Sequence, residues 1–270
     1  MKISNTKKAV ILGIRFDGNS SLRHGTAEAP EEIRSILYNG ISNLCTENGI
    51  DLEQDKQWMD AGDLIPDRNF SFPETIHTSI STYLNQGLRL LILGGDHSIT
   101  YPSIQAYAKR YNELNILHLD AHPDLYDSYD GNRYSHASPF ARIMEENLAK
   151  RLVQIGIRTM NPHQKSQADR FNVEIIHARD WEINKCPVFQ GPVYLSIDLD
   201  VLDPAFAPGV SHPEPGGLTT RDIISIIQSL RTTVVGCDIV EYNPRRDTLQ
   251  ITGTVVVKLF KECLGKLLEE

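Results

Sequence analysis

The sequence predicts an α/β fold built around a mainly parallel sheet. Short apolar runs rich in Val, Ile and Leu recur along the 270 residues, and most are followed by a segment with helical periodicity. No proline-rich or serine-rich linker divides the chain, and no internal repeat is found. We therefore expect a single domain that covers residues 1–270.

The expected strands are these apolar runs. Seven are well defined, at residues 9–14, 88–93, 115–119, 152–157, 173–176, 193–197 and 234–239, and a weaker one lies near 58–61. Nearly continuous apolar strands are typical of a sheet that is covered by helices on both faces.

Between the strands, six segments have the spacing of amphipathic helices. They are residues 29–38, 73–85, 102–111, 139–148, 219–230 and 255–268. Thr219 precedes Asp222 by three residues, an arrangement in which each side chain can accept a free backbone N–H at the start of a helix.

Composition excludes several classes of protein. The net charge is -8 and no stripe of Lys and Arg is present, which argues against nucleic-acid binding and mildly favours a cationic small molecule. No stretch reaches transmembrane length, so no membrane partner is expected. The N-terminus lacks the core of a signal peptide, and the four cysteines are isolated. These features predict a cytoplasmic protein.

In a parallel sheet, reactive residues gather beyond the carboxyl ends of the strands. The run at 88–93 stops at the segment GGDHS, residues 94–98, which delivers His97 to a strand end. The alternative is an ordinary helix start, with Asp96 or Ser98 as its cap and the glycines as a turn.

Two further runs end in acidic residues. The run at 115–119 is followed by Asp120, His122 and Asp124, and the mutual repulsion of the carboxylates favours a bound cation over a simple polar turn. The run at 193–197 is followed by Asp198 and Asp200, at the same alternating spacing. Asp203, which precedes Pro204, is expected to be a turn residue or a partner of the ligands instead of a ligand.

Together the three strand ends supply six side chains of metal-ligand type: His97, Asp120, His122, Asp124, Asp198 and Asp200. Six ligands exceed the need of one ordinary site. Four carboxylates and two imidazoles suit two divalent ions, and this oxygen-rich set favours Mn²⁺ over Zn²⁺. A pair of such ions can hold a hydroxide at neutral pH, so the expected chemistry is hydrolysis.

The motifs resemble those of the ureohydrolase superfamily, which includes arginases, agmatinases and formiminoglutamases. The segments are GGDHS at 94–98, DAHPD at 120–124, SIDLDVLDPAFAPG at 196–209 and PGGLT at 215–219. The resemblance extends from Gly25 to residue 244 and is taken to be strongest to agmatinase-like members. It implies a three-layer α/β/α arginase-like fold with an eight-stranded sheet and two Mn²⁺ per subunit.

The resemblance also implies roles for individual residues. One ion would be bound by His97, Asp120, Asp124 and Asp198, and the other by Asp120, His122, Asp198 and Asp200. Glu241, at the end of the last apolar run, would hold the guanidinium of the substrate. His136 would transfer a proton to the departing amine, so Glu241, His136 and Asp124 form the expected catalytic set.

Agmatine is the expected substrate, with putrescine and urea as products. The loop at 125–131 lacks the arrangement of Asn and Ser that is usual in arginases, and Asp127 is a candidate partner for a distal amine. His212 lies in a loop that differs from that of many agmatinases, and it is a second candidate for contact with the substrate tail. Arginine, guanidinobutyrate, guanidine and formiminoglutamate remain open.

Other functions and roles remain open as well. A catalytically silent family member or a metal-dependent deacetylase on a similar scaffold would belong to a different class. The resemblance further implies a homotrimer or homohexamer. Among the remaining histidines, His118 is expected to be a hydrogen-bonded core residue, and His24, His77, His163 and His177 are expected to be ordinary surface or capping residues.

Overall fold

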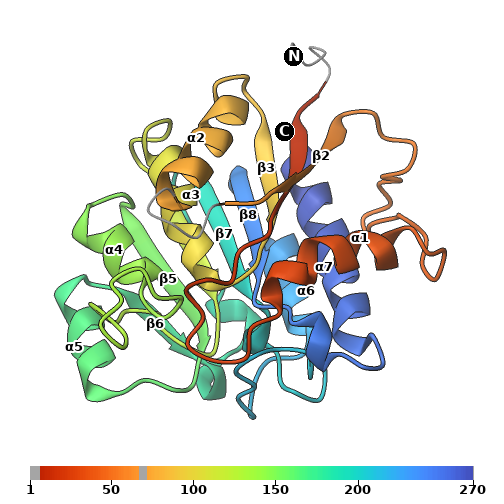
Figure 1. Cartoon of the computed structure of the whole chain (residues 1–270). Coiled ribbons are helices and arrows are strands. Elements are labelled where there is room, and N and C mark those ends of the chain that lie inside the picture. The colour runs from red at the N-terminus through yellow and green to blue at the C-terminus, as the bar shows by residue number, and fades with distance from the viewer. Residues whose placement is uncertain (1–6, 67–71, 270) are drawn as a thin grey trace.

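A computed structural model describes residues 7–66 and 72–269 and confirms the α/β fold (Figure 1). Within these residues, eight strands form one sheet in the order β2-β1-β3-β8-β7-β4-β5-β6. Every neighbouring pair is parallel, so the sheet is wholly parallel instead of mainly parallel. The strands are β1 (Ala9–Ile14), β2 (Trp58–Leu64), β3 (Arg89–Leu93), β4 (Asn115–Leu119), β5 (Arg151–Ile157), β6 (Glu174–His177), β7 (Val193–Asp198) and β8 (Val234–Val240).

All the expected strands are present, and the weak one is an edge strand. In β2 no side chain is fully buried, whereas every residue of its neighbour β1 is buried. An edge strand pairs on one side only and needs fewer apolar residues, which explains its weak signal. The helices are α1 (Ala29–Leu37), α2 (Phe72–Leu84), α3 (Thr100–Ala108), α4 (Pro139–Glu145), α5 (Pro162–Arg170), α6 (Thr220–Ser229) and α7 (Ile251–Leu268).

Helix α5 was not predicted from the sequence. Its residues, PHQKSQADR, are almost all polar, and only Gln164, Gln167 and Ala168 are buried. A helix without an apolar stripe lacks the periodic signal on which the prediction depends. Its start is nevertheless well formed, because Pro162 follows the cap residue Asn161, whose side chain accepts the backbone N–H of Gln164 at 2.9 Å.

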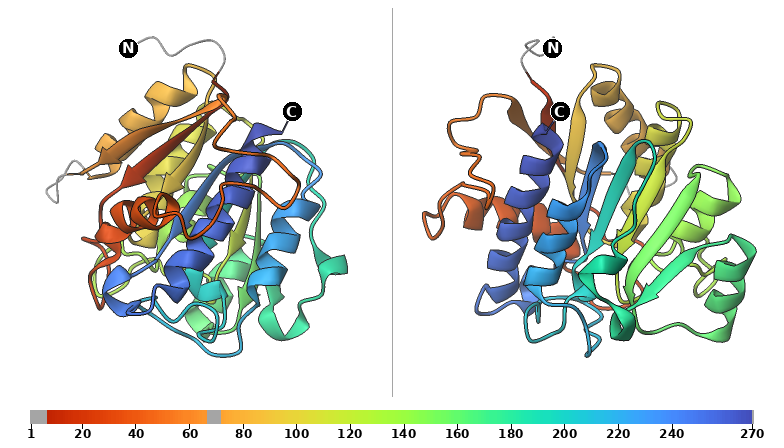
Figure 2. Two further views of the ribbon diagram at one scale, coloured as in Figure 1. Left: turned by 90° about the vertical axis from the view of Figure 1, so that its right-hand side faces the viewer. Right: turned by 180° about the vertical axis from the view of Figure 1, so that it is seen from behind.

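Helices cover both faces of the sheet, which gives the expected three layers (Figure 2). Helices α1, α6 and α7 pack on one face and α2, α3, α4 and α5 on the other, and each face has its own apolar cluster. Side chains of each strand alternate between the two clusters. In β3, for example, Leu91 and Leu93 join the first cluster, and Leu90 and Ile92 join the second.

The strand order brings the predicted site residues together. The four central neighbours are β3, β8, β7 and β4. Because all of them are parallel, the segments that follow them lie at one edge of the sheet. The residues at or shortly after these strand ends include His97, Glu241, Asp198 with Asp200, and Asp120, respectively.

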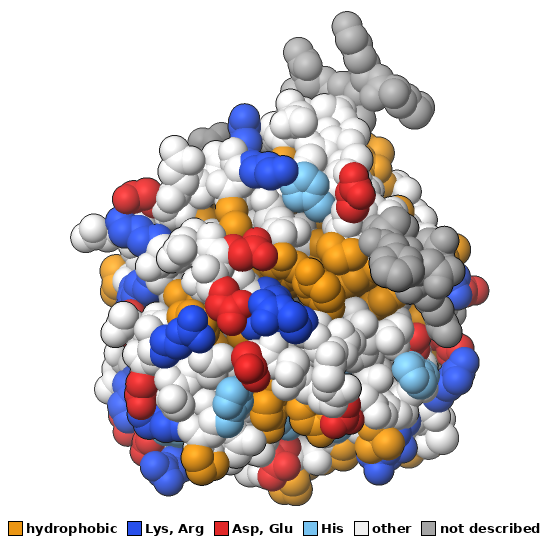
Figure 3. Space-filling model, turned by 60° about the vertical axis from the view of Figure 1, so that its left-hand side comes forward, with side chains coloured by type: hydrophobic (Ala, Val, Ile, Leu, Met, Phe, Trp, Pro, Cys, Tyr) orange, Lys and Arg blue, Asp and Glu red, His pale blue; other side chains and the backbone are white. Residues whose placement is uncertain are grey.

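Charged side chains of both signs occur together on the surface (Figure 3). On the face shown in Figure 3, Lys and Arg side chains are interspersed with Asp and Glu and do not gather into one positive patch. Among the described helices, none is both long enough and apolar enough to span a membrane.

Candidate active site

The loop after β3 is held in place by a close backbone approach. A Cβ atom at Gly95 would lie 1.7 Å from the carbonyl oxygen of Phe16, so only glycine fits there. Asp96 caps the short 3-10 helix that follows by accepting the backbone N–H of Ser98 at 3.0 Å. The alternative of an ordinary helix start therefore holds for Asp96, which acts as the cap. The fully buried ring of His97, by contrast, points toward the acidic residues.

Backbone N–H groups orient three of the aspartates. Asp120 Oδ1 accepts the backbone N–H of His122 at 2.5 Å, and Asp198 Oδ1 accepts that of Asp200 at 2.9 Å. Asp200 Oδ1 accepts the backbone N–H of Ala121 at 3.0 Å, which links the segments after β4 and β7. In each case one carboxylate oxygen is fixed by the backbone and the other, Oδ2, faces a neighbouring histidine.

The six predicted ligands lie together. Nδ1 of His97 is 3.3, 3.1 and 3.2 Å from Oδ2 of Asp120, Asp124 and Asp198, in that order. Nδ1 of His122 lies 3.0 Å from Asp200 Oδ2 and 3.4 Å from Asp120 Oδ1. Asp120 therefore belongs to both groups, as expected for a carboxylate shared by two ions.

A chain of buried hydrogen bonds fixes the tautomer of His97. Asp238 accepts the hydroxyls of Thr100 and Tyr194, both at 2.8 Å, and of Ser196 at 2.6 Å. Because the Ser196 proton goes to Asp238, its oxygen must accept the Nε2–H of His97, which is 3.0 Å away. Nδ1 is then a lone pair, and it has no hydrogen-bond partner among the described residues.

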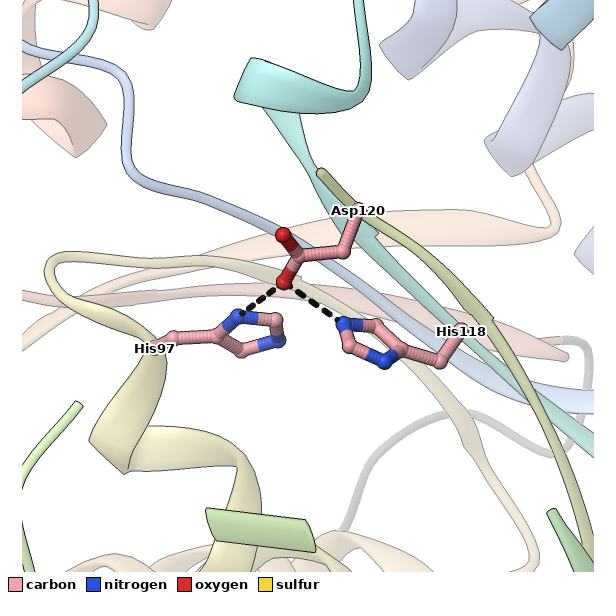
Figure 4. A group of neighbouring side chains, drawn as sticks. All are labelled: His97, His118 and Asp120. Atoms are coloured by element: carbon pink, nitrogen blue, oxygen red, sulfur yellow. Dashed lines mark hydrogen bonds and ion pairs between the residues drawn. The ribbon is translucent and has the colours of Figure 1, made fainter. Parts of the chain in front are cut away.

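His118 is a hydrogen-bonded core histidine, as expected: it lies close enough to His97 and Asp120 to share a metal ion with them, but both of its ring nitrogens are engaged in hydrogen bonds. The amide of Gln154 donates to the carbonyl oxygen of Pro123 at 2.7 Å and to Nδ1 of His118 at 3.0 Å. Nε2 of His118 therefore carries the proton and donates to Asp120 Oδ2 at 2.8 Å, whereas His97 approaches the same oxygen from the other side (Figure 4). Burial lowers the pKa of His118 to about 4, which keeps its ring neutral.

The electrostatics of this cluster call for a cation. Burial, together with the charge of Asp120, raises the pKa of Asp124 to about 6. Burial and the charges of Asp200 and Asp120 raise the pKa of Asp198 well above its ordinary value. Without a metal, a lone pair of His97 would face three carboxylates, and these carboxylates would repel one another. A pair of divalent ions removes both problems, so the residues present fit such a centre.

A pocket of about 190 Å³ opens over the cluster. Its lining includes Asp124, Asp198, Asp200 and His122, together with His136 and Glu241. Asp124 and Glu241 have φ of 51° and 64°, a strained conformation for residues with a Cβ, which is often found at functional sites.

Glu241 and His136 form a pair at the base of this pocket. Oε1 of Glu241 accepts the backbone N–H of His97 at 3.0 Å and lies 3.1 Å from Nδ1 of His136. Oε2 of Glu241 is buried and has no partner among the described residues. Burial alone would lower the pKa of His136, but Glu241 raises it to about 9.

The two residues expected to contact a substrate tail differ in position. His212 lines the pocket, with its ring centroid 5.1 Å from that of His136. Asp127 is absent from the pocket lining, and its half-exposed carboxylate lies 3.2 Å from Nε2 of His163. The position of Asp127 thus gives no support to its expected contact with a distal amine.

Several polar residues of the site were not singled out from the sequence. Ser196, Asp238 and Gln154 lie within otherwise apolar strands and are fully buried. A buried polar side chain in an apolar strand needs a partner, and this signal could have identified them. Thr159, Asn161 and Gln164 line the pocket. They precede or begin the unpredicted helix α5, so no pattern pointed to them.

Arg158 is a further residue that was missed. Its guanidinium donates to the carbonyl oxygens of Asp200 at 2.5 Å, of Val201 at 3.2 Å and of Glu214 at 2.6 Å. It thereby ties the segment after β7 to the loop that carries His212. Asp203, by contrast, is the expected loop residue, since its carboxylate accepts the backbone N–H groups of Ala205, Gly216 and Gly217.

Comparisons with known proteins agree with this architecture. The model of the arginase family matches residues 7–265. Arginase 1, mitochondrial, of Arabidopsis thaliana is 43% identical over 95% of this chain and 80% of its own length. The structure of an arginase from Medicago truncatula superposes with a TM-score of 0.90 at 40% identity, over 97% of this chain and 88% of that one.

An agmatine ureohydrolase of Thermoplasma volcanium is also similar, with a TM-score of 0.85 at 31% identity over 98% of this chain and 92% of that one. The plant arginases share more residues with the chain than this protein does. The expectation that the resemblance is strongest to agmatinases is therefore corrected. With the family model matching almost the whole length, the chain belongs to the arginase family of ureohydrolases.

Proposed function

We propose that the chain hydrolyses L-arginine to L-ornithine and urea at a binuclear manganese centre. The observation that carries this proposal is the lining of the pocket, which combines four of the six ligands and a free glutamate oxygen with the neutral side chains of Thr159, Asn161 and Gln164. The first part serves a guanidinium and the second an amino-acid tail.

His97, Asp120, Asp124 and Asp198 would hold one ion, and Asp120, His122, Asp198 and Asp200 the other. Two bound Mn²⁺ ions would supply Lewis acidity and a hydroxide nucleophile at neutral pH. The protein fixes these ligands through the backbone N–H groups on the aspartates and through Ser196 and His118 on the buried side.

Glu241 binds and orients the guanidinium. Its Oε1 is held by the backbone N–H of His97 and by His136, which fixes the orientation of the carboxylate. Its Oε2 has no partner among the described residues and is free to accept an N–H of the substrate. Although burial would raise the pKa of Glu241, His136 and the N–H of His97 lower it, so the carboxylate is charged when the cation arrives. A planar guanidinium paired with a buried carboxylate is thereby placed in one orientation.

His136 holds the proton that the reaction needs. When the C–N bond of the guanidino group breaks, the departing amine nitrogen must gain a proton. His136 carries one at neutral pH, because Glu241 raises its pKa to about 9, and its Nε2 is positioned 2.9 Å from Ser21 Oγ. It therefore acts as the general acid.

The outer part of the pocket favours arginine over agmatine. All its lining carboxylates, Asp124, Asp198, Asp200 and Glu241, are engaged with the metals or the guanidinium. Thr159, Asn161 and Gln164 are neutral, and their side-chain types include both donors and acceptors, although the amide of Asn161 also bonds the backbone N–H of Gln164 and the hydroxyl of Tyr126. Such groups suit the zwitterionic end of an amino acid, whereas the lone ammonium of agmatine would require another carboxylate.

Urea release from L-arginine, agmatine and guanidinobutyrate by the Mn²⁺-loaded protein tests the proposal, and we expect the highest kcat/KM for L-arginine. Asn161→Asp places a negative charge in the pocket lining, so kcat/KM should fall for L-arginine and rise for agmatine. Asn172→Asp, at a residue outside the pocket lining, serves as the matched control. If the wild type prefers agmatine, the assignment of an amino-acid tail to the substrate is refuted. Formamide as the product would indicate a formimino substrate. If no product forms from any of these compounds, hydrolysis itself is refuted.

Location and assembly stay predictions. The names of several plant relatives place those proteins in mitochondria, whereas we continue to propose a cytoplasmic location for this chain. A homotrimer or homohexamer is likewise proposed from the family resemblance. Sedimentation analysis of the metal-loaded protein would test the assembly directly.

A further inference from the structure

Three side chains beside the six ligands form a second group of metal-binding type. His136 precedes α4, His212 belongs to the loop that follows β7, and Glu241 follows β8. One ligand atom from each lies within 4.8 Å of the other two. This group shares the pocket with the six ligands but uses none of them.

Two members of the group have unused acceptor capacity. Oε2 of Glu241 is buried, and no described residue bonds to it. Glu241 itself is 4% exposed, so water does not readily compensate. Within residues 7–66 and 72–269 the ring nitrogens of His212 have no hydrogen-bond partner, and its ring lies beside those of His136 and His122, at centroid distances of 5.1 and 6.4 Å. Both groups thus face the pocket with lone pairs to offer.

We propose that His136, His212 and Glu241 bind a Zn²⁺ ion that blocks the pocket when no substrate is present. The blocking effect rests on the proposed function, because the same Glu241 and His136 would engage the guanidino group. Binding of the ion itself does not depend on which substrate the protein uses.

The ligand set selects zinc over manganese. Two imidazoles and one carboxylate with an open fourth position form a common zinc arrangement, whereas the neighbouring aspartate-rich cluster suits Mn²⁺. Ligand atoms of a tetrahedral zinc lie roughly 3.3 Å apart, given bonds of about 2.0 Å. Nδ1 of His136 and Oε1 of Glu241 are already 3.1 Å apart, so they match one edge of the tetrahedron. A small movement of the His212 loop would complete it.

Charge in the pocket permits an additional cation. The carboxylates of Asp120, Asp124, Asp198 and Asp200 would offset the charge of two divalent ions. Glu241 adds a further negative charge, which protonated His136 offsets when no zinc is bound. A zinc ion on Nδ1 of His136 would take the place of that proton, which is released to solvent. A zinc ion at Glu241 would meet this charge in a site largely closed to solvent.

Titration of the Mn²⁺-loaded protein with ZnCl₂, followed by dialysis and metal analysis, tests the inference. We expect one Zn²⁺ per chain to bind without loss of Mn²⁺. His212→Asn and Glu241→Gln should each weaken zinc binding by at least about tenfold while the manganese content is retained. His177→Asn, which changes a histidine that bonds the carbonyl oxygen of Ile157 outside this pocket, should bind zinc as the wild type does.

A parallel measurement of urea release should show zinc inhibition that is competitive with the guanidino substrate. The inference is overturned if zinc binds only with an equal loss of manganese, if no third ion binds, or if both variants bind zinc with wild-type affinity. Urea release without a third ion would refute this inference alone. A third ion on a protein that releases no urea would support the site and refute the proposed function.

Discussion

Ser196→Ala removes the hydroxyl that accepts the Nε2–H of His97 at 3.0 Å and donates to Asp238 at 2.6 Å. Asp238 keeps the hydroxyls of Thr100 and Tyr194, so the loss falls mainly on His97, which is fully buried. A metal on Nδ1 forces the proton onto Nε2, and this N–H then has no partner in the variant. The cost of a buried, unpaired N–H is about 1–3 kcal/mol.

This cost applies to the metal-bound state alone. In the metal-free variant the ring can carry its proton on Nδ1, which lies 3.1–3.3 Å from three carboxylate oxygens. The affinity for the ion bound by His97 should therefore fall by a factor of about 5 to 150, since about 1.4 kcal/mol corresponds to tenfold. The ion held by His122 should be affected much less.

Competition with a chelator, followed by measurement of bound Mn²⁺, gives the two dissociation constants. Ser225→Ala is the matched control, because that hydroxyl donates to the carbonyl oxygen of Arg221 on the exposed side of α6. If both constants in Ser196→Ala remain within about twofold of those of the wild type, the hydroxyl does not fix the tautomer and the reasoning is refuted.

Further predictions concern packing and pH. Gly95→Ala would place a Cβ 1.7 Å from the Phe16 carbonyl oxygen, so we expect the free energy of unfolding, measured with urea, to fall by at least about 3 kcal/mol. For the control Gly87→Ala, where φ is +79° but the space is open, we expect a fall of about 1–2 kcal/mol. Equal losses in the two variants would contradict this. In the metal-free protein, Glu241 raises the pKa of His136 to about 9 from an ordinary value near 6.5, although burial opposes this. The stabilisation from protonated His136 is thus full below about pH 6.5 and lost as the pH rises through about 9. The difference in Tm between wild type and His136→Asn should shrink over that range, and a constant difference would count against the pairing.

Much of the fold was readable from local sequence. Apolar runs such as 115–119 mark strands because both faces of the sheet are buried, and the structure places β4 at those residues. Helix α5 escaped prediction for the opposite reason, since its residues bury only a small polar surface. Because burial leaves no periodic pattern in α5, formation of this helix depends on the cap at Asn161 and on the segments of the protein that pack beside it.

The candidate site was predicted in part for a related reason. Asp120 and Asp198 lie directly at the ends of apolar strands, His97 follows another apolar strand by four residues, and a parallel sheet aligns such ends at one edge. Asp127 shows the limit of this logic. It lies only three residues beyond Asp124 in the chain, yet its carboxylate contacts His163 and does not line the pocket.

The sequence by itself determined the strands, the six candidate ligands at their ends and the class of chemistry, because these depend on burial and residue type over short stretches. Only the tertiary structure decided that β3, β8, β7 and β4 are neighbours, and that Ser196 and Asp238 orient His97. It also decided that Asn161 and Gln164 line the pocket and that Asp127 does not. These features depend on which distant segments pack together, and hydrogen bonds between them leave no periodic trace in the chain.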